Sequence, residues 1–439
     1  MNAYECFLKR FNKDSLTEIY YKYVHYTMST GVDGVIANDK YDVKSDVELI
    51  LKKVYKGNYR FSKYKEKLIS KGARKHPRVI SIPTVRDRVV LKALHLTLQD
   101  IYPECSKTLI PQLMLDDIKS QVKNYKYKSF IKVDIKEFYP SINHQLLEEK
   151  LSGRFPTKAL RLLITSAITN PTGFQGSIQG VPQGLSISNV LAEIYLKDLD
   201  KKFSCRESNT YNRYVDDVLV FSTDNRPKGL LDEIINEFSR LSLTCHPYDE
   251  IGSKTQIDTL NKEFDFLGYY IKNRKLTVKK ESVLRVENSI AKIINSHKYI
   301  SDARASITQN KLNLRVTGCV FEGKRRGWLF YYSQMEDDTI LYKLDSTVGK
   351  LLKQAKLDGA IKPKKFSKAF YESSRNKLNN HKYIVNFDGY SINEKRSLLS
   401  QFMDDVKVTA LNDDVVNSLF SKRVKHLVKD LEEDIRENS

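Results

Sequence analysis

Tyr211-Asn-Arg-Tyr-Val-Asp-Asp-Val-Leu-Val-Phe221 contains two short apolar runs with an acidic pair, Asp216 and Asp217, between them. Such runs are typical of buried strands. Because burying unpaired carboxylates costs several kcal/mol, the pair requires a solvent-exposed hairpin tip or a bound cation. A simple Asp-Asp turn between two strands remains open from this segment alone.

A second strand pattern, Ser129-Phe-Ile-Lys-Val-Asp134, also ends at a carboxylate. A carboxylate at a strand end that meets an acidic hairpin suits a site for two Mg²⁺ ions about 3.5–4 Å apart. Crowded carboxylates repel each other without a cation. The metal is therefore part of the hypothesis.

The remaining pattern predicts an α+β protein. Strands are expected at 79–82 and near 243, 264 and 276, and the chain is expected to be mainly helical from residue 282 onward. Helices are expected over 2–28, 43–55, 86–101, 157–169, 186–203 and 228–241, and from about residue 143. A loop rich in Gly and Gln covers 171–184.

Composition excludes several classes of protein. The 439 residues are 41% hydrophobic, which is too apolar for a disordered chain. No apolar run reaches the roughly 18 residues that a membrane span needs, and the first ten residues do not resemble a signal peptide. Five well-separated cysteines without a C-x-x-C pair favour a reducing cytoplasm.

The net charge of +20 is concentrated in one segment. Residues 51–92 hold fourteen Lys or Arg and only two acids, with Tyr55, Tyr59 and Tyr64 interleaved. Basic residues mixed with aromatic rings are common where proteins bind nucleic acid. A solvated lysine-rich face is the competing interpretation.

Four motifs together resemble those of reverse transcriptases. They are Val133-Asp-Ile-Lys-Glu-Phe-Tyr-Pro-Ser-Ile142, Gly180-Val-Pro-Gln-Gly184, Tyr214-Val-Asp-Asp217 and Phe264-Asp-Phe-Leu-Gly268, in the family's order over about 30–280. The resemblance implies a right-hand polymerase. Its expected parts are the fingers at 1–128, the palm at 129–280, a helical thumb at 281–355 and a helical C-terminal extension at 356–439.

The resemblance also implies roles for individual residues. Asp134, Asp216 and Asp217 would be the catalytic residues and, together with Ile135, would hold the metal ions, with Asp217 the less essential of the three aspartates. The nucleotide-binding set would be Lys71, Arg74, Arg78, Tyr139, Gln183, Gly184 and Lys254, and the primer grip Phe266, Leu267 and Gly268. Tyr139 would exclude a 2′-hydroxyl, and Gly184 would let the backbone approach the ligand. An ordinary core aromatic and a surface lysine are the competing interpretations of Tyr139 and Lys254.

Gly31-Val-Asp-Gly34 and Ile82-Pro-Thr-Val-Arg-Asp-Arg88 resemble the bacterial group II intron lineage. No Cys-pair endonuclease motif follows the thumb. A chain without this motif resembles the unknown-group reverse transcriptases associated with phage defence. The expected function is RNA-directed DNA polymerisation with two Mg²⁺ ions, dNTPs, a primer and an RNA template, expected to be a dedicated non-coding RNA. A non-catalytic maturase-like RNA-binding scaffold and a template-independent or protein-primed DNA polymerase are the alternatives.

Overall fold

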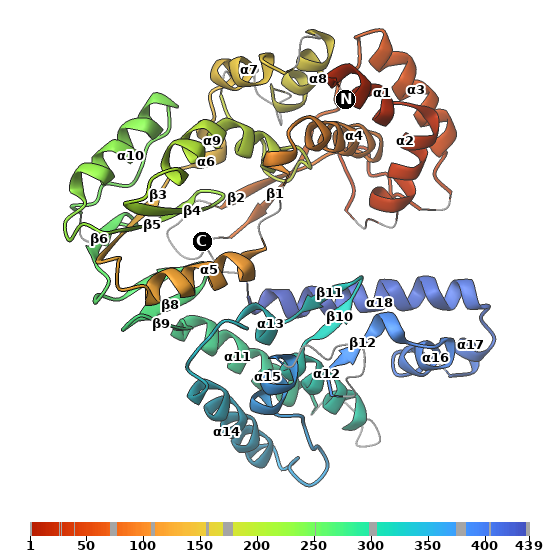
Figure 1. Ribbon diagram of the computed structural model, residues 1–439. Helices are drawn as coiled ribbons and strands as arrows, with labels where there is room; N and C mark the ends of the chain where they lie inside the picture. Colours follow the sequence, from red (N-terminus) through yellow and green to blue (C-terminus); the bar gives the residue numbers. More distant parts are fainter. Residues whose placement is uncertain are drawn as a thin grey trace. The chain divides into compact units, whose positions relative to one another are not determined.

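The computed structural model describes residues 2–25, 27, 29–38, 40–70, 77–106, 110–154, 158–169, 179–250, 252–297, 305–374, 383–403 and 405–435. The chain divides into two compact units. The first comprises Met1–Leu109, Tyr125–Thr259 and Asn438–Ser439, and the second comprises Ile110–Asn124 and Leu260–Glu437. Helices and sheets occur in both units, so the predicted α+β class is confirmed (Figure 1).

The first unit begins with short helices rather than one long one. They are α1 (Ala3–Arg10), α2 (Lys13–Ile19) and a π-helix (Tyr20–Val24). The predicted single helix over 2–28 is wrong because Phe11 leaves the helical region, with φ −102° and ψ 61°. Asn12 then caps α2 by accepting a hydrogen bond from the backbone N–H of Ser15.

Two later helices of this unit match their predicted positions, α3 (Val43–Tyr55) and α4 (Val85–Ile101). Between them, β1 (Lys65–Ile69) and β2 (Arg78–Ile82) pair as an antiparallel ribbon. All five residues of β1 are exposed. A strand without a buried face has no apolar alternation, which explains why the sequence did not predict β1.

A four-stranded antiparallel sheet is the centre of the first unit. Its strands are β3 (Ser129–Asp134), β4 (Asn209–Tyr214), β5 (Asp217–Ser222) and β6 (Gln256–Thr259), in the order β4-β5-β3-β6. The strand predicted near 243 is wrong: that segment contributes only an isolated bridge between Cys245 and Ile135. The edge position beside β3 belongs to β6 instead.

Helices cover one face of this sheet. α9 (Ser188–Ser204) and α10 (Lys228–Arg240) share a core with Ile131, Val133 and Val218 (Figure 1). Successive strand residues face opposite sides. Asp134 and Asp217 therefore project from the face opposite this core. The same unit contains α6 (Phe138–Ser141), α7 (His144–Ser152), α8 (Lys158–Thr169) and a 3₁₀ turn (Pro103–Cys105).

The second unit is mainly helical from residue 282, as predicted. It starts with α5 (Pro111–Lys123) and an antiparallel sheet of β7 (Phe264–Phe266), β8 (Tyr269–Lys272) and β9 (Lys275–Val278). Then follow α11 (Lys280–Ser296), α12 (Ala305–Thr317), β10 (Cys319–Phe321), β11 (Lys324–Arg326), α13 (Trp328–Tyr331), α14 (Thr339–Gln354) and α15 (Phe366–Ser374). The last elements are β12 (Val385–Asn386), a 3₁₀ turn (Phe387–Gly389), α16 (Ile392–Ser400), α17 (Asp405–Thr409) and α18 (Asp413–Glu433).

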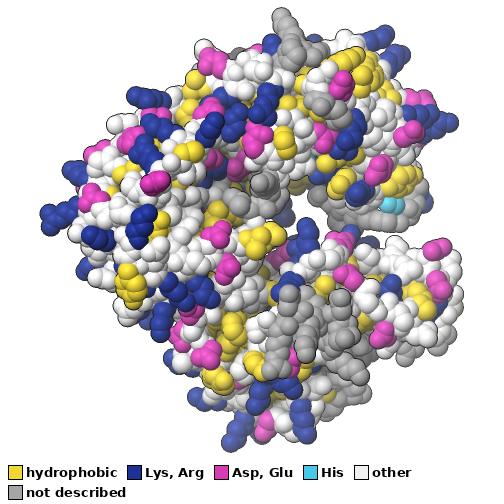
Figure 2. Space-filling model, in the orientation of Figure 1, with side chains coloured by type: hydrophobic (Ala, Val, Ile, Leu, Met, Phe, Trp, Pro, Cys, Tyr) yellow, Lys and Arg dark blue, Asp and Glu magenta, His cyan; other side chains and the backbone are white. Residues whose placement is uncertain are grey.

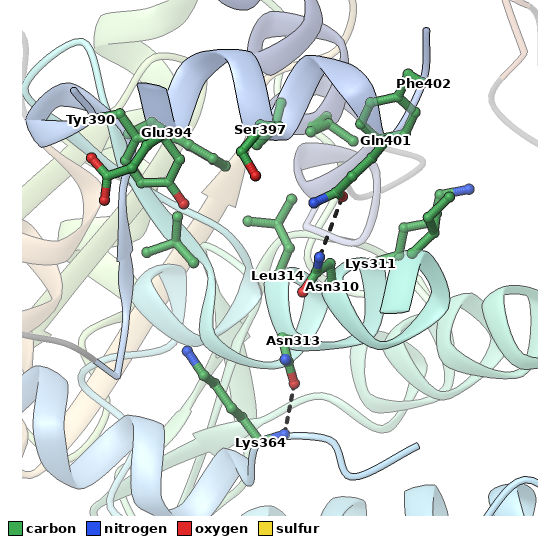
Figure 3. A pocket seen from close by; sticks show the side chains of 15 residues that line it. Asn310, Lys311, Asn313, Leu314, Lys364, Tyr390, Glu394, Ser397, Gln401 and Phe402 are labelled. Carbon is green, nitrogen blue, oxygen red and sulfur yellow. Dashed lines mark hydrogen bonds between the residues drawn. The ribbon is translucent and has the colours of Figure 1, made fainter. Parts of the chain in front are cut away.

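In this unit, residues from before and after position 356, where the C-terminal extension was expected to begin, pack in one hydrophobic core. Phe420 and Val424 of α18 are buried in the same cluster as Cys319 and Phe321. A cavity of about 260 Å³ lies beside it, lined by residues that include Asn310, Lys364, Tyr390, Glu394 and Gln401 (Figure 3). No described helix of either unit is long and apolar enough to cross a membrane.

Candidate active site

The β4–β5 hairpin and strand β3 bring the sequence-predicted aspartates together. Tyr214 pairs with Asp217 across the hairpin, so Val215 and Asp216 form its two-residue turn. On the other side of β5, Asp217 pairs with Asp134, the last residue of β3. Directly opposed residues on antiparallel strands have Cβ atoms about 4.5–5.5 Å apart on the same face. The two strand-end carboxylates are therefore neighbours, with Asp216 beside them.

Two nitrogen-bearing side chains contact the Asp134 carboxylate. Lys254 Nζ lies 3.2 and 3.3 Å from its two oxygens, and His246 Nε2 lies 3.2 Å from Oδ2. The backbone N–H of His246 also donates to the Asp134 carbonyl at 3.0 Å. The sequence predicted Lys254 but missed His246. That residue follows the single bridge at Cys245, and such a short pairing has no periodic signal.

The aspartates perturb one another electrostatically. Burial, and then the charge of Asp216, raise the pKa of Asp217 to about 7. Burial and the charge of Asp134 raise the pKa of Asp216, while Arg78 and Lys254 oppose that rise. Carboxylates that disfavour one another's ionisation in this way favour a bound cation.

The oxygen donors present fit Mg²⁺ by their chemistry. Hard divalent ions prefer carboxylate and carbonyl oxygens. The bridge between Ile135 and Cys245 uses the Asp134 carbonyl and the Lys136 N–H, so the Ile135 carbonyl lies outside those two bonds. Within the described residues, no three His, Cys, Asp or Glu side chains are grouped closely enough to hold a metal. The Asp134 carboxylate is paired with Lys254 and His246 instead.

Several predicted nucleotide-binding residues lie in the electrostatic surroundings of Asp216. Arg78 starts β2, and its charge acts on Asp216. Tyr139, on α6, donates a hydrogen bond to Asn189 Oδ1 at 2.7 Å. Burial and then the charge of Asp216 raise the pKa of Tyr139. Lys71 and Arg74 fall outside the described residues.

Gln183 and Gly184 contact strand β2. The Gln183 carbonyl accepts a hydrogen bond from Ser81 N–H at 2.7 Å. Gly184 has φ +101°, and a Cβ there would lie 2.7 Å from Ile80 Cγ2 and 2.8 Å from the Ser81 carbonyl oxygen. The close approach to β2 therefore already requires glycine, whereas the sequence analysis attributed this glycine to ligand approach.

The predicted primer-grip residues form a tight hairpin in the second unit. Phe266 pairs with Tyr269, and the turn residues Leu267 and Gly268 have φ +47° and +78°. Two positive φ angles are the pattern of a type I′ turn. Tyr331 Oη donates a hydrogen bond to the Leu267 carbonyl at 3.1 Å. This bond holds Leu267, for which a positive φ is less favourable than for Gly268. The hairpin occurs where the sequence analysis expected it, and its primer-grip role stays a prediction.

Comparison with known families supports this chemistry. Residues 64–271 match the family described as "Reverse transcriptase (RNA-dependent DNA polymerase)". The matched segment, just under half of the 439 residues, is therefore similar to reverse transcriptases. It contains Asp134, Asp216 and Asp217 together with Arg78, Tyr139 and Lys254.

Two curated relatives of this chain are distant in sequence. The chain is 28% identical over 146 residues to the "Putative COX1/OXI3 intron 2 protein" of Saccharomyces cerevisiae, covering 31% of this chain and 17% of that protein. It is 25% identical over 167 residues to the "Group II intron-encoded protein LtrA" of Lactococcus lactis, covering 35% of this chain and 28% of that protein. The chain therefore spans less than a third of either relative.

Two solved telomerase structures are similar to part of the chain. One from Candida tropicalis, in complex with a fragment of telomeric RNA, is 14% identical, covers 86% of this chain and 62% of that chain, and has a TM-score of 0.41. One from Candida albicans is 13% identical, covers 89% and 65%, and has a TM-score of 0.40.

Proposed function

We propose that this protein is an RNA-directed DNA polymerase that adds dNTPs to a primer on an RNA template. The observation that carries the proposal is the register of β3 against β5. It sets Asp134 opposite Asp217 beside the Asp216 turn, inside the segment that matches the reverse transcriptase family. Neighbouring carboxylates with raised pKa values suit divalent cations and phosphoryl transfer.

The roles proposed for the side chains follow from their charge and placement. Asp134, Asp216, Asp217 and the Ile135 carbonyl would hold two Mg²⁺ ions, which would supply activation of the primer 3′-hydroxyl and stabilisation of the leaving pyrophosphate. Lys254, whose Nζ lies 3.2 Å from Asp134, would donate a proton to the leaving phosphate oxygen. Arg78 at the start of β2 would bind the triphosphate through its guanidinium group.

Tyr139 is the proposed sugar discriminator. Its ring is held by the hydrogen bond to Asn189 and lies in the field of Asp216, Glu193 and Arg78. A fixed ring below the incoming sugar would exclude a 2′-hydroxyl by steric contact. We expect Tyr139→Ala to raise incorporation of ribonucleotides relative to deoxynucleotides, measured by competition of rNTP with dNTP.

Basic groups support a nucleic-acid partner for the first unit. Lys65 and Lys67 lie on the exposed β1 strand. A separate cavity of about 380 Å³ is lined by residues that include Arg88, Lys92, Gly184 and Ser186. Figure 2 shows Lys and Arg side chains spread over the drawn face, with acids between them. Such a surface suits contacts to a phosphate backbone.

The deciding experiment measures primer extension. Purified protein, an RNA template with an annealed primer, dNTPs and Mg²⁺ should give full-length DNA, and Asp216→Asn should reduce extension to background. Asp232→Asn is the matched control, since Asp232 is exposed on α10 and should leave extension unchanged. Full extension by Asp216→Asn would show the metal-site assignment to be wrong.

The same assay separates the other two functions. A maturase-like scaffold would bind RNA without incorporating any dNTP. A template-independent or protein-primed polymerase would make DNA without added template or primer, and in the primed case DNA would remain covalently attached to the protein.

The proposal extends to a bacterial cytoplasmic enzyme of the group II intron-like lineage that copies a dedicated structured RNA in phage defence. This part rests on the sequence resemblance. Sequencing the RNA and DNA that co-purify with the protein should yield one dominant template. Cells that express the protein should resist phage infection, and cells that express Asp216→Asn should not.

A further inference from the structure

The catalytic hairpin contains a backbone conformation that valine rarely adopts. Val215, the first residue of the two-residue turn, has φ +59°. A β-branched residue at positive φ is a true outlier, and the first position of such turns usually belongs to glycine. Backbone strain of this kind persists only where the surroundings enforce it. Some contact must therefore hold this turn.

Arg213 supplies that contact. This side chain is only 5% exposed, and its Nη1 donates to the Val215 carbonyl at 2.8 Å. Its Nε and Nη2 donate to the two Asp200 oxygens at 2.7 and 2.5 Å. Nη1 and Nη2 also donate to the two Glu193 oxygens at 3.1 and 2.5 Å. All five guanidinium N–H groups are thus used, four on carboxylates and one on the turn.

Helix α9 makes this arrangement rigid. Glu193 and Asp200 are seven residues apart on α9 and so lie on the same face of the helix. Tyr211 Oη also donates to Asp200 Oδ1 at 3.0 Å, which ties β4 to the same carboxylate. The guanidinium is planar, so fixing four of its N–H groups fixes the direction of the fifth.

We infer that Arg213 is a positioning residue that holds the Val215 peptide and thereby sets the orientation of Asp216 and Asp217 for divalent-ion binding. This inference rests on the proposed function and adds a residue to it. Groups that orient metal ligands typically contribute about 10-fold to 100-fold to metal affinity or activity.

Arg213→Lys tests the inference because it keeps the positive charge and removes the planar fork. Mn²⁺ is the probe, and free Mn²⁺ is measured by electron paramagnetic resonance. We expect the Kd for Mn²⁺ to rise and kcat for extension to fall, each by about 10-fold or more. KM for dNTP should change less than about 3-fold, because the nucleotide contacts remain.

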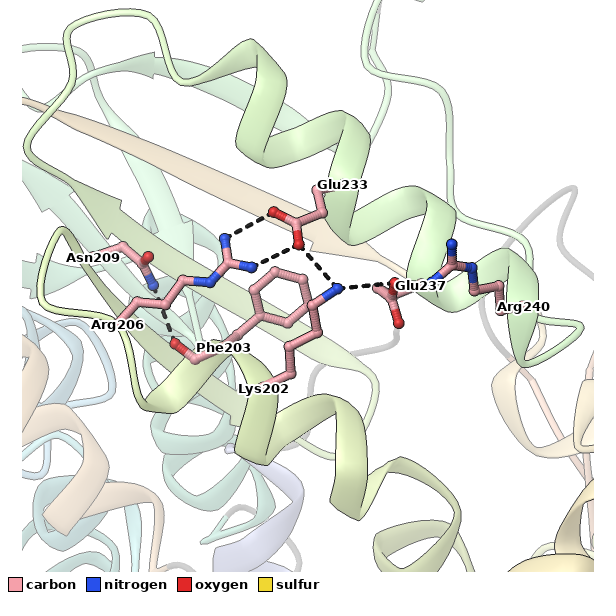
Figure 4. A network of polar contacts seen from close by, with 7 residues as sticks. All are labelled: Lys202, Phe203, Arg206, Asn209, Glu233, Glu237 and Arg240. Carbon is pink, nitrogen blue, oxygen red and sulfur yellow. Dashed lines mark hydrogen bonds and ion pairs between the residues drawn. The ribbon is translucent and has the colours of Figure 1, made fainter.

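The matched control is Arg206→Lys, seven residues earlier. Arg206, in the connection between α9 and β4, also makes a two-pronged contact, to Glu233 at 2.6 and 2.8 Å, away from the turn (Figure 4). It should keep the wild-type Kd for Mn²⁺ and the wild-type kcat. An equal loss in both lysine variants would assign the effect to general destabilisation and overturn the inference.

Val215→Gly tests the turn without touching the charged cluster, and it serves alone if Arg213→Lys does not fold. Glycine accepts positive φ but also permits other turn conformations, so Mn²⁺ affinity should fall while the melting temperature stays within a few degrees. The double variant with Arg213→Lys should be no weaker than the weaker single variant, because both loosen the same turn. Multiplied losses, or wild-type Mn²⁺ affinity in Val215→Gly, would overturn the inference.

The Mn²⁺ measurement separates this inference from the proposed function. Wild-type protein that binds Mn²⁺ without extending a primer would contradict the polymerase proposal alone. Wild-type Mn²⁺ affinity and kcat in Arg213→Lys would contradict the positioning role alone.

Discussion

Two arginine–carboxylate clusters lie seven residues apart, and they differ in burial. Arg213 is 5% exposed between Glu193 and Asp200, whereas Arg206 is 30% exposed beside Glu233, which Lys202 also contacts (Figure 4). Burial alone would lower the pKa of Arg213, but Asp200 and Glu193 outweigh burial and raise it. The same residue types thus form an internal clamp at one place and a surface ion pair at the other.

The comparison shows that the number of partners and the solvent exposure of an arginine determine how strongly it constrains the backbone that it contacts. The buried guanidinium has no water to replace a lost partner, so each of its contacts constrains the backbone that it touches. The exposed guanidinium can exchange its carboxylate for water at little cost. Only the Arg213 cluster should therefore affect both the stability of the protein and the conformation of the Val215–Asp216 turn.

The largest expected effect on stability comes from removing the guanidinium group of the buried Arg213 cluster. Arg213→Met should lower the free energy of unfolding by about 3–5 kcal/mol, because it leaves two carboxylates without their cation. Arg206→Met should lower it by at most about 1 kcal/mol. Urea denaturation of both variants measures the difference, and equal losses would contradict the contrast between the clusters.

A second prediction concerns a half-buried histidine, His95. Burial and then Lys92 lower the pKa of His95 to about 4, although a hydrogen bond to the Ser186 backbone opposes the shift. The unfolded chain then binds the extra proton, so stability should rise between about pH 4 and 6.5, by at most about 3 kcal/mol. His95→Gln should flatten that part of the pH–stability curve, and an unchanged slope would show that His95 is not its source.

A third prediction concerns variants that restore charge balance in the Arg213 cluster by neutralising its two carboxylates. Adding Glu193→Gln and Asp200→Asn to Arg213→Met should recover about 2 kcal/mol of stability, because neutral amides replace uncompensated charges. The Mn²⁺ affinity should not recover, since nothing then donates to the Val215 carbonyl. Recovery of both properties would indicate that charge balance, rather than the fork, sets the turn.

The smallest expected effect concerns salt. The stability difference between wild type and Arg206→Met should disappear in 1 M NaCl, where the Debye length is about 3 Å. The difference for Arg213→Met should persist, because buried pairs are screened much less. Denaturation at low and high salt measures both, and equal salt sensitivity would contradict the assigned burial difference.

The sequence predicted elements that have a strong apolar period. α3, α10 and β3 lie within about one residue of their predicted bounds, because each has a buried face. The exposed strand β1 has no such face and was missed, and the break at Phe11 was hidden by apolar residues on both sides. Periodicity reports burial, so it cannot detect elements or breaks that burial does not mark.

The sequence analysis named the three neighbouring aspartates and Lys254, but it named neither Arg213 nor His246. Asp134, Asp216 and Asp217 stood out because carboxylates interrupt apolar strands. Arg213 lies on β4, whereas its carboxylate partners lie on α9, and His246 reaches Asp134 beside a single bridge. A lone charge in a strand has many explanations until its partner is known.

By itself, the sequence determined which residues carry charge and which strands need burial, and therefore the identity of the three aspartates. Only the tertiary structure decided which strand ends meet, which nitrogen-bearing side chains contact Asp134, and that Arg213 holds the Val215 turn. The physical reason is that carboxylates and guanidinium groups act over a few ångströms. Register and helix placement set those distances, and residue order does not specify them.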